Sequence, residues 1–402
     1  MTTTHSRRQF CIGMGALACA AGSGLVPAAP PPAPRLRVGI IGHTGRGDYG
    51  HGLHTLWLQL PETEIAAVAD PDAAGLKAAL SKLRCDRGFA DYRKMLSDVR
   101  LDIVAIGMRH IDQHRDAALA AAEAGVRGLY IEKPFCRSAA EADEIVAACD
   151  RHRVKVAIAH RNRYHPVLPT IRRLLDDGAV GRLLEIRARG KEDARGGPLD
   201  LWVLGSHVLN IVHCLGGRPR ACTAMVYQDA RPVTAADLKP GAEGVGPIAG
   251  NRLHARFEIE SGAPAFFDSV QNAGSAAAGF GLQWIGTQGI IDLRMDQEPM
   301  AHFRPGNPFQ PVKAPSAWTP ISSAGIGLPE PNPDLVQDVM AHRVPARDLI
   351  DAICRDREPL CSASDGRVVI EMITAVFASH QLRGARVEWP LKDRFHPWAP
   401  PA

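Results

Sequence analysis

The chain has 402 residues, enough for two or three domains, and its 46% hydrophobic and 22% charged residues are typical of a globular protein with a sizeable core. Such a core needs neither a metal nor a disulfide to hold it together. The formal net charge is +4, and Arg7 and Arg8 supply half of it. The sequence contains no basic block and no interleaving of aromatic and basic residues, which argues against a nucleic acid as the main partner.

Residues 1–34 are predicted to be an export leader with a proline-rich spacer. Ser6–Phe10 carries two adjacent arginines, and the apolar stretch Cys11–Ala21 that follows is too short to span a membrane. The paired arginines resemble a Tat signal, although a Sec signal can also carry them. Pro27–Pro34 is typical of an extended, semi-rigid spacer. We therefore expect a periplasmic protein exported by the Tat pathway, without stable membrane association.

Residues 35–159 alternate short apolar runs with alanine-rich stretches. The runs predict strands at Leu36–Ile41, Glu64–Ala69, Asp102–Ile106, Gly128–Ile131 and Val154–Ala159, and the stretches predict helices at Ala73–Leu83, Asp112–Ala124 and Ala139–Arg151. Ser138 is the expected N-cap of the last helix, and a short helix is expected at Lys94–Leu96. This alternation predicts a parallel sheet with helices on both faces, the α/β Rossmann arrangement.

Residues 160–402 are predicted to form a second, α+β domain. Its expected strands are Leu183–Arg189, Ala221–Tyr227, Leu253–Ile259, Ala263–Gln271, Leu282–Ile285 and Ile290–Leu293, and its expected helices are His165–Asp177, Leu199–Leu215, Arg347–Cys354 and Asp365–Gly384. Runs of strands without intervening helices predict a mainly antiparallel sheet. Ser269–Gly281 and Asp296–Pro333 are rich in glycine and proline and are predicted to be loops.

The cysteines and histidines do not indicate a disulfide framework or a metal site. Seven cysteines follow the leader, an odd number without a Cys-x-x-Cys pair, so small buried side chains are favoured, and one bridge in an oxidising compartment stays open. His110, His114, His160 and His213 lack metal-ligand spacing with a third ligand. We expect no metal.

The turn after the first predicted strand indicates a dinucleotide site. Gly42, Gly45 and Gly47 depart from the strict G-x-G-x-x-G because Thr44 stands at the second glycine position, and Arg46 precedes the last. Exposed N–H groups at the start of a following helix would meet a pyrophosphate.

An acidic residue at the end of the second predicted strand indicates which dinucleotide is bound. Asp70 stands where a carboxylate can accept the adenine ribose hydroxyls, which favours NAD. NADP stays open, because Arg46 could reach a 2′-phosphate.

Glu132-Lys133-Pro134 closes the predicted strand Gly128–Ile131. A lysine at the carboxyl end of a parallel strand, about ninety residues after a phosphate-type turn, lies at the edge of a dinucleotide crevice, where the nicotinamide ring would be. The alternative is an ordinary surface lysine.

Several motifs in this order resemble the Gfo/Idh/MocA oxidoreductases. They are the glycine-rich turn, Asp70, Met108–His110, Glu132-Lys133-Pro134, Asn162–Pro166 and Gly205-Ser206-His207. The resemblance covers roughly residues 35–390. It implies a nucleotide-binding domain, an open antiparallel sheet, a carbohydrate substrate held between the sheet and the nicotinamide, and a homo-oligomer. It also implies that the turn residues, Asp70, His110, Glu132, Lys133 and Arg163 line the cofactor.

The resemblance gives Lys133 and His207 the catalytic roles. Lys133 would bind the oxygen of the carbinol being oxidised, and His207 would take its proton. Val203 stands one helical turn before His207 where the family carries Asp, so the usual His–Asp pair is broken. Asn210 stands where relatives often carry Asp and could hold a substrate hydroxyl. His207 as a core histidine is the alternative.

Tyr164 and His165 are further candidate substrate residues, and Arg163 is either a crevice residue or one half of an interdomain ion pair. Trp202 and Trp284 could stack on a sugar, with ordinary packing as the default.

The function we expect is an exported NAD(P)-dependent oxidoreductase that moves a hydride between a tightly held cofactor and a sugar or polyol. One alternative is an NAD-dependent glycosidase or lyase that oxidises its sugar transiently. The other is a non-catalytic sugar-binding protein.

Overall fold

The computed structural model describes residues 35–274, 280–311 and 316–399, and Arg35–Ala402 forms one compact unit. The predicted leader, with its Tat-type signal, lies outside the described residues. The predicted boundary between residues 159 and 160 falls inside the compact unit and stays a prediction.

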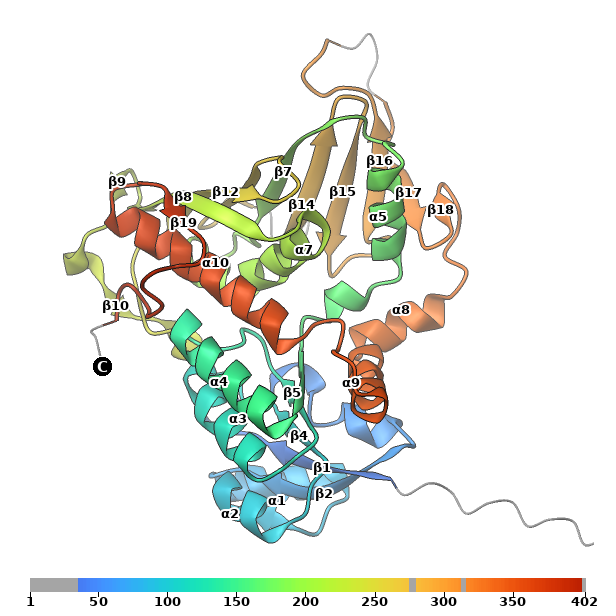
Figure 1. Ribbon diagram of the computed structural model, residues 1–402, viewed down its shortest axis with the longest axis vertical. Coiled ribbons are helices and arrows are strands. Elements are labelled where there is room, and N and C mark those ends of the chain that lie inside the picture. The colour runs from blue at the N-terminus through green and yellow to red at the C-terminus, as the bar shows by residue number, and fades with distance from the viewer. Residues whose placement is uncertain (1–34, 275–279, 312–315, 400–402) are drawn as a thin grey trace, which may run out of the picture. The chain divides into compact units, whose positions relative to one another are not determined.

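A six-stranded parallel sheet forms the first part of the fold (Figure 1). Its order is β3 (Gly88–Phe89), β2 (Thr63–Ala69), β1 (Leu36–Ile41), β4 (Ile103–Ile106), β5 (Gly128–Ile131) and β6 (Lys155–Ile158). The five predicted strands are present, and only the two-residue β3 was not predicted. The chain reverses its direction of travel across the sheet between β1 and β4, and ligands of such sheets bind at that point, outside the carboxyl ends of the strands.

Four helices follow strands of this sheet, and three of them have side-chain N-caps. They are α1 (Ala73–Leu83), α2 (Tyr92–Asp98), α3 (His114–Glu123) and α4 (Ala139–His152). Ser138 caps α4 as predicted, by accepting from Glu141 N. Asp72 caps α1 and Asp91 caps α2 in the same way.

The helix expected directly after the glycine-rich turn is wrong. Two short 3₁₀ helices, Gly50–Gly52 and Leu56–Gln59, stand there instead. Asp48 and His51 adopt positive φ values of 55° and 45°, and Gly52 adopts 77°, so an α-helix cannot propagate through this segment.

Helix α9 (Arg343–Arg355), from the far end of the chain, covers the face of the sheet on which these two 3₁₀ helices lie (Figure 1). Its Ala346, Leu349 and Ile353 share a core cluster with β1, β4 and β5. A Cβ on Gly128 would lie 2.5 Å from Ile353 Cδ1, so this glycine is what lets α9 approach β5 closely. The Tyr130 hydroxyl on β5 lies 2.8 Å from Nδ1 of His342, the residue before α9.

The second part of the fold is an eleven-stranded, mainly antiparallel sheet. Its order is β18 (Gly325–Ile326), β17 (Thr319–Ser322), β16 (Ala301–Pro305), β15 (Gly289–Met295), β14 (Phe280–Gly286), β7 (Leu183–Arg189), β13 (Ala265–Val270), β12 (Arg252–Ile259), β8 (Pro219–Gln228) and β19 (Val387–Glu388), with β9 (Arg231–Pro232) paired to β8. Only β7 and β13 run parallel. The predicted α+β class is confirmed, with a parallel sheet followed by this sheet.

Helices α5 (Val167–Asp176), α7 (Ser206–Gly216) and α10 (Ala363–Gln381) accompany the large sheet, and α8 (Pro333–Met340) leads into α9 (Figure 1). The predicted loop at Asp296–Pro333 is wrong in part, because β16, β17 and β18 lie within it. These strands are short and interrupted by proline, which hid their alternation. The predicted helix Leu199–Leu215 is instead α6 (Pro198–Asp200), a π-helical turn (Leu201–Gly205) and α7.

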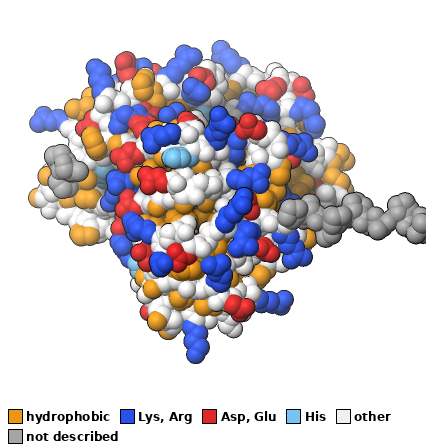
Figure 2. Space-filling view, turned by 60° about the horizontal axis from the view of Figure 1, so that its bottom comes forward, with side chains coloured by type: hydrophobic (Ala, Val, Ile, Leu, Met, Phe, Trp, Pro, Cys, Tyr) orange, Lys and Arg blue, Asp and Glu red, His pale blue; other side chains and the backbone are white. Residues whose placement is uncertain are grey.

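The described part of the chain holds one helical stretch, Pro198–Gly216, that is long and apolar enough to cross a membrane, but 83% of it is buried inside the fold. No disulfide joins the cysteines there, and five of the seven are buried as predicted. Figure 2 shows Lys and Arg side chains interspersed with Asp and Glu on the face it presents.

Candidate active site

The glycine-rich turn lies at the carboxyl end of β1, as predicted. Gly45 and Gly47 adopt φ values of 81° and 83°, which other residues adopt only with strain. A Cβ on Gly42 would lie 2.1 Å from the Tyr49 ring, so this glycine lets the ring lie against the turn. The turn is held by Asp48, whose Oδ1 accepts from Gly45 N at 2.9 Å.

Thr44 binds the carboxylate that the sequence assigned to the adenine ribose. Asp70 is fully buried, and its oxygens accept from Thr44 N at 3.1 and 3.2 Å and from Thr44 Oγ1 at 2.7 Å. Asp72 N donates to it as well, at 3.0 Å. A ribose hydroxyl would therefore compete with the Thr44 hydroxyl, a consequence of the threonine at the second glycine position.

A cavity of about 210 Å³ opens beside this pair, between the ends of β1, β2 and β4. Gly42, Asp70, Tyr92, Met108 and Gln113 are among the residues that line it. Its position at the reversal of strand order, its tyrosine ring and its buried carboxylate fit the adenosine half of a dinucleotide.

Arg46 and Gly47 connect the turn to the segment that follows β4, which carries His110 and Asp112. Arg46 forms an ion pair with Asp112, so its charge is already partly neutralised. A Cβ on Gly47 would lie 2.7 Å from His110 Cδ2, so His110 packs against the turn. Burial and the charge of Arg46 lower the pKa of His110.

Glu132 links the end of β5 to the segment after the glycine-rich turn. Its side chain is 1% exposed, its Oε1 lies 2.7 Å from His51 Nδ1, and its Oε2 has no partner in the described part of the chain. Burial would raise its pKa, but the hydrogen bond and charge of His51 and the charge of Lys133 outweigh burial and lower it to about 2. The glutamate is therefore ionised, and one of its oxygens is buried without a partner among the described residues.

Lys133 is buried at the end of β5, so the surface-lysine alternative is wrong. It is 5% exposed, and its Nζ donates to the Val203 carbonyl at 3.2 Å. The Lys133–Pro134 peptide is cis. Burial lowers the pKa of Lys133, against the charges of Glu132 and Glu243. A π-helical turn supplies the carbonyl, and such turns are frequent at functional sites.

His207 lies in the first turn of α7, four residues after Val203. It is 9% exposed, and its Nδ1 has no partner within the described residues. The His160 ring lies edge-to-face against it, with centroids 5.0 Å apart, and Phe280 lies on another side at 6.0 Å. Burial, followed by the charges of Lys133 and His160, holds the pKa of His207 well below its usual range. A neutral imidazole is the form that can accept a proton.

The structure assigns Arg163, Tyr164 and His165 to packing between parts of the fold. Arg163 forms a buried ion pair with Asp365 at 2.8 Å, which was the alternative for this residue. The Tyr164 hydroxyl donates to Asp348 at 2.9 Å, and His165 Nε2 lies 3.0 Å from Glu298 Oε1.

Asn210 and the two candidate tryptophans are also enclosed. Asn210 is fully buried and donates to Cys361 Sγ at 3.6 Å, and its Oδ1 is unpartnered among the described residues. Trp202 and Trp284 are fully buried, so ordinary packing accounts for them. Asp200 accepts from Ser269 Oγ at 2.6 Å and from two backbone N–H groups, so it does not orient His207.

The segment between β9 and β12 contacts the candidate site from the second part of the fold. Glu243 accepts from Arg109 at 2.8 Å, and a Cβ on Gly244 would lie 2.3 Å from Asp112 Oδ1. Residues from about 235 to 248 therefore form a flap against the turn and the β4 end. No local pattern in the sequence indicates this contact, because its two sides are 134 residues apart.

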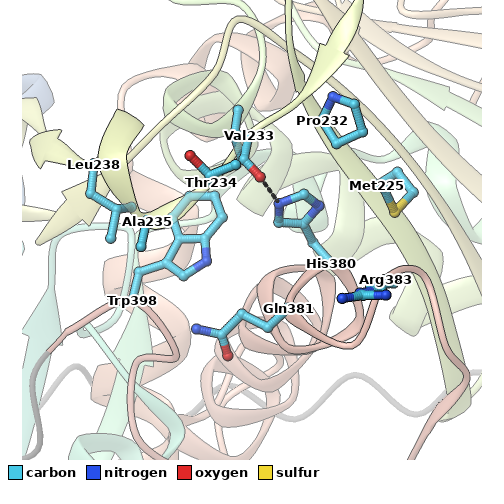
Figure 3. A pocket seen from close by; sticks show the side chains of 10 residues that line it. All are labelled: Met225, Pro232, Val233, Thr234, Ala235, Leu238, His380, Gln381, Arg383 and Trp398. Atoms are coloured by element: carbon cyan, nitrogen blue, oxygen red, sulfur yellow. Dashed lines mark hydrogen bonds between the residues drawn. The ribbon is translucent and has the colours of Figure 1, made fainter.

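A cavity of about 540 Å³ lies elsewhere, between β8 and the end of α10 (Figure 3). Met225, Val233, Leu238 and Trp398 give it apolar walls. Its histidine is fully engaged: His380 Nε2 lies 3.1 Å from the Val233 carbonyl and Nδ1 accepts from Val226 N at 3.2 Å. It therefore offers no free catalytic group comparable to His207.

Comparisons with known proteins show which proteins this chain is similar to. Residues 36–160 match the family model described as Oxidoreductase family, NAD-binding Rossmann fold. D-apiose dehydrogenase from Paraburkholderia graminis is 35% identical over 125 residues, which are 31% of this chain and 33% of that protein. Levoglucosan dehydrogenase from Pseudarthrobacter phenanthrenivorans is 23% identical over 317 residues, 67% of this chain and 78% of that protein. Trans-1,2-dihydrobenzene-1,2-diol dehydrogenase of Xenopus tropicalis is a further relative. This chain matches about a third of its length, as it does for D-apiose dehydrogenase.

Solved structures share the whole described fold. Levoglucosan dehydrogenase in complex with NADH and L-sorbose superposes with a TM-score of 0.70 at 20% identity, covering 89% of this chain and all of that one. An oxidoreductase from Agrobacterium radiobacter in complex with NAD+, L-tartaric acid and magnesium gives 0.64 at 19% identity, covering 88% and 98%. Residues 36–160 therefore match the family model of an NAD-binding Rossmann fold, and the described chain shares the two-part fold of the solved dehydrogenases.

Proposed function

We propose that this protein is an NAD-dependent dehydrogenase that acts on a hydroxyl group of a sugar or polyol. The observation that carries the proposal is the placement of Lys133. It is buried at the carboxyl end of β5, at the same sheet edge as the glycine-rich turn, and bonded to the helix that carries His207. The named relatives that oxidise apiose and levoglucosan support a carbohydrate substrate.

The residues present fit a nicotinamide dinucleotide. The 210 Å³ cavity suits the adenosine half, and the buried Asp70 carboxylate disfavours a 2′-phosphate, hence NAD. When bound, NAD accepts a hydride. Lys133 would hydrogen-bond the substrate oxygen and stabilise its developing negative charge, and the neutral His207 would accept the hydroxyl proton.

A second candidate is an NAD-dependent glycosidase or lyase, in which oxidation of the sugar is transient. The apolar Val203, one turn before His207, favours it, because the usual carboxylate partner of the base is absent. Such an enzyme would convert its sugar without net change in the reduced nicotinamide absorbance.

The first experiment is to denature the purified mature protein and identify any nucleotide it releases. We expect NAD or NADH in stoichiometric amount, and a screen of sugars should then show growth of the reduced-nicotinamide band. Lys133→Met should keep the nucleotide and lose the turnover. A protein that carries no nucleotide and binds neither NAD(H) nor NADP(H) would exclude both enzymes and leave a sugar-binding protein.

We also propose export and self-association. The paired arginines of the leader support export by the Tat pathway, and a tightly retained cofactor would suit a compartment poor in free nucleotides. Fractionation of cells expressing the full chain and its Arg7→Lys/Arg8→Lys variant tests export. Light scattering of the purified protein tests the homo-oligomer.

A further inference from the structure

The register of β5 and β6 brings Lys133 and His160 together. Ile131 pairs with Ile158, and Ala159 N donates to the Ile131 carbonyl at 2.9 Å. Lys133 and His160 each follow their paired isoleucine by two residues. They therefore leave the sheet at neighbouring points on its carboxyl edge, where ligands of such sheets bind.

His160 is buried and incompletely bonded. It is 2% exposed, and its Nδ1 has no partner in the part of the chain that the structure describes. Burial and the charge of Lys133 lower its pKa to about 3, so it is a neutral ring. A buried polar atom without a partner destabilises the folded state, so such an atom in a native fold requires an explanation.

The Nδ1 atom of His207 is also buried without a partner among the described residues. The side chain one turn before it is Val203, which cannot bond an imidazole, and Phe280 on another side is also apolar. Among the described residues, the polar ring in contact with His207 is that of His160. Two imidazoles joined by an N–H···N bond of about 2.9 Å have centroids about 5 Å apart. The observed separation is 5.0 Å, with the planes at 85°. The two rings are therefore at the separation that an N–H···N bond between them requires.

We propose that His160 is the positioning residue of His207, in place of the absent carboxylate. His160 accepts a hydrogen bond from His207 Nδ1–H and so fixes the tautomer in which Nε2 carries the lone pair. Nε2 then takes the proton of the substrate hydroxyl. The proposal deepens the proposed function and rests on it for the last step, whereas the pairing of the two rings does not depend on a substrate.

The pairing is tested by ¹⁵N NMR of the full mature chain labelled at histidine, with the His207 signals assigned from their loss in His207→Gln. We expect wild-type His207 to be one neutral tautomer with the proton on Nδ1. His160→Phe keeps a ring of similar shape without a nitrogen and should give a mixture of tautomers. His160→Gln, which can still accept a hydrogen bond, should restore the single tautomer. His207 ring shifts that are identical in wild type and His160→Phe would overturn the proposal.

Turnover separates this inference from the proposed function. With a sugar that the wild type oxidises, His160→Phe should lower kcat about 10²-fold, at the lower end of what general-base catalysis contributes, while NAD affinity is unchanged. An active His160→Phe with full kcat would refute the positioning role and leave the dehydrogenase standing. A tautomer shift in a protein that oxidises no sugar would refute the dehydrogenase and leave the histidine pair standing.

Discussion

Acid should destabilise this fold through its buried neutral histidines. His160 and His342 are 2% and 3% exposed, and the pKa of each is lowered to about 3. In both, burial is the largest cause. For His342 the charges of Arg161, His51 and Lys133 act in the same direction, and Glu132 opposes them.

The sign follows from proton counting. Below about pH 6.5 the unfolded chain binds a proton at each of these histidines and the folded chain does not, so the free energy of unfolding falls as the pH falls. Each histidine removes about 1.4 kcal/mol per pH unit, hence about 2 kcal/mol at pH 5. The two together remove about 4 kcal/mol, a large part of an ordinary stability of about 5–15 kcal/mol. The lowered pKa of Glu132 matters only below about pH 4.5, outside this window.

The test replaces one of these histidines. His342 has φ 61°, a conformation that asparagine tolerates, and an asparagine carbonyl could still accept from the Tyr130 hydroxyl. Urea unfolding followed by circular dichroism at about pH 7, 6 and 5 gives the slope. His342→Asn should reduce the loss between pH 7 and 5 by about 2 kcal/mol, whereas His152→Asn, at an exposed position, should leave it unchanged. A wild-type slope in His342→Asn would refute the reasoning.

Three further changes test contacts between the parts of the fold and the cofactor cleft. Asp365→Asn leaves the largely buried Arg163 uncompensated and should lower the free energy of unfolding by about 3 kcal/mol, whereas Asp98→Asn, which breaks a more exposed pair, should lower it much less; equal losses in urea unfolding would contradict this. Thr44→Ala frees a carboxylate lone pair for the adenine ribose, so titration by nucleotide fluorescence should show tighter NADH binding, and weaker binding would show that the threonine contacts the nucleotide instead. Glu243→Gln removes the ion pair of the flap and should speed NADH release in stopped flow by about two- to fivefold, because a partly exposed pair contributes up to about 1 kcal/mol; an unchanged rate would show that this ion pair does not retain the nucleotide.

The sequence predicted the elements whose pattern is local. Strand β1, helix α1 and the cap Ser138 stand where periodicity and capping residues placed them. The prediction of a helix after the glycine-rich turn was wrong for a reason that is visible in the local sequence. Gly50-His51-Gly52 disfavours a helix, and the family pattern outweighed that signal.

The candidate site was predictable only for residues at strand ends. Lys133 was found because it closes a strand, and His160 closes the neighbouring strand and could have been found by the same rule. Glu243 could not, because nothing in its own surroundings indicates a contact with Arg109. The sequence allowed two roles for Arg163, a crevice residue or one half of an ion pair. The structure shows an ion pair with Asp365, a residue of the distant helix α10.

The missing helix after β1 explains why the two parts of the fold form one unit. A parallel sheet needs cover on both faces, and here one face is covered by α9, which follows every strand of the second sheet except β19 in the chain. Leu349 and Ala346 on that helix are fully buried against the strands that end at the candidate site. The edge that carries Lys133 therefore keeps its geometry only while the C-terminal helices are docked, so the binding of nucleotide and the folding of the second part are energetically coupled.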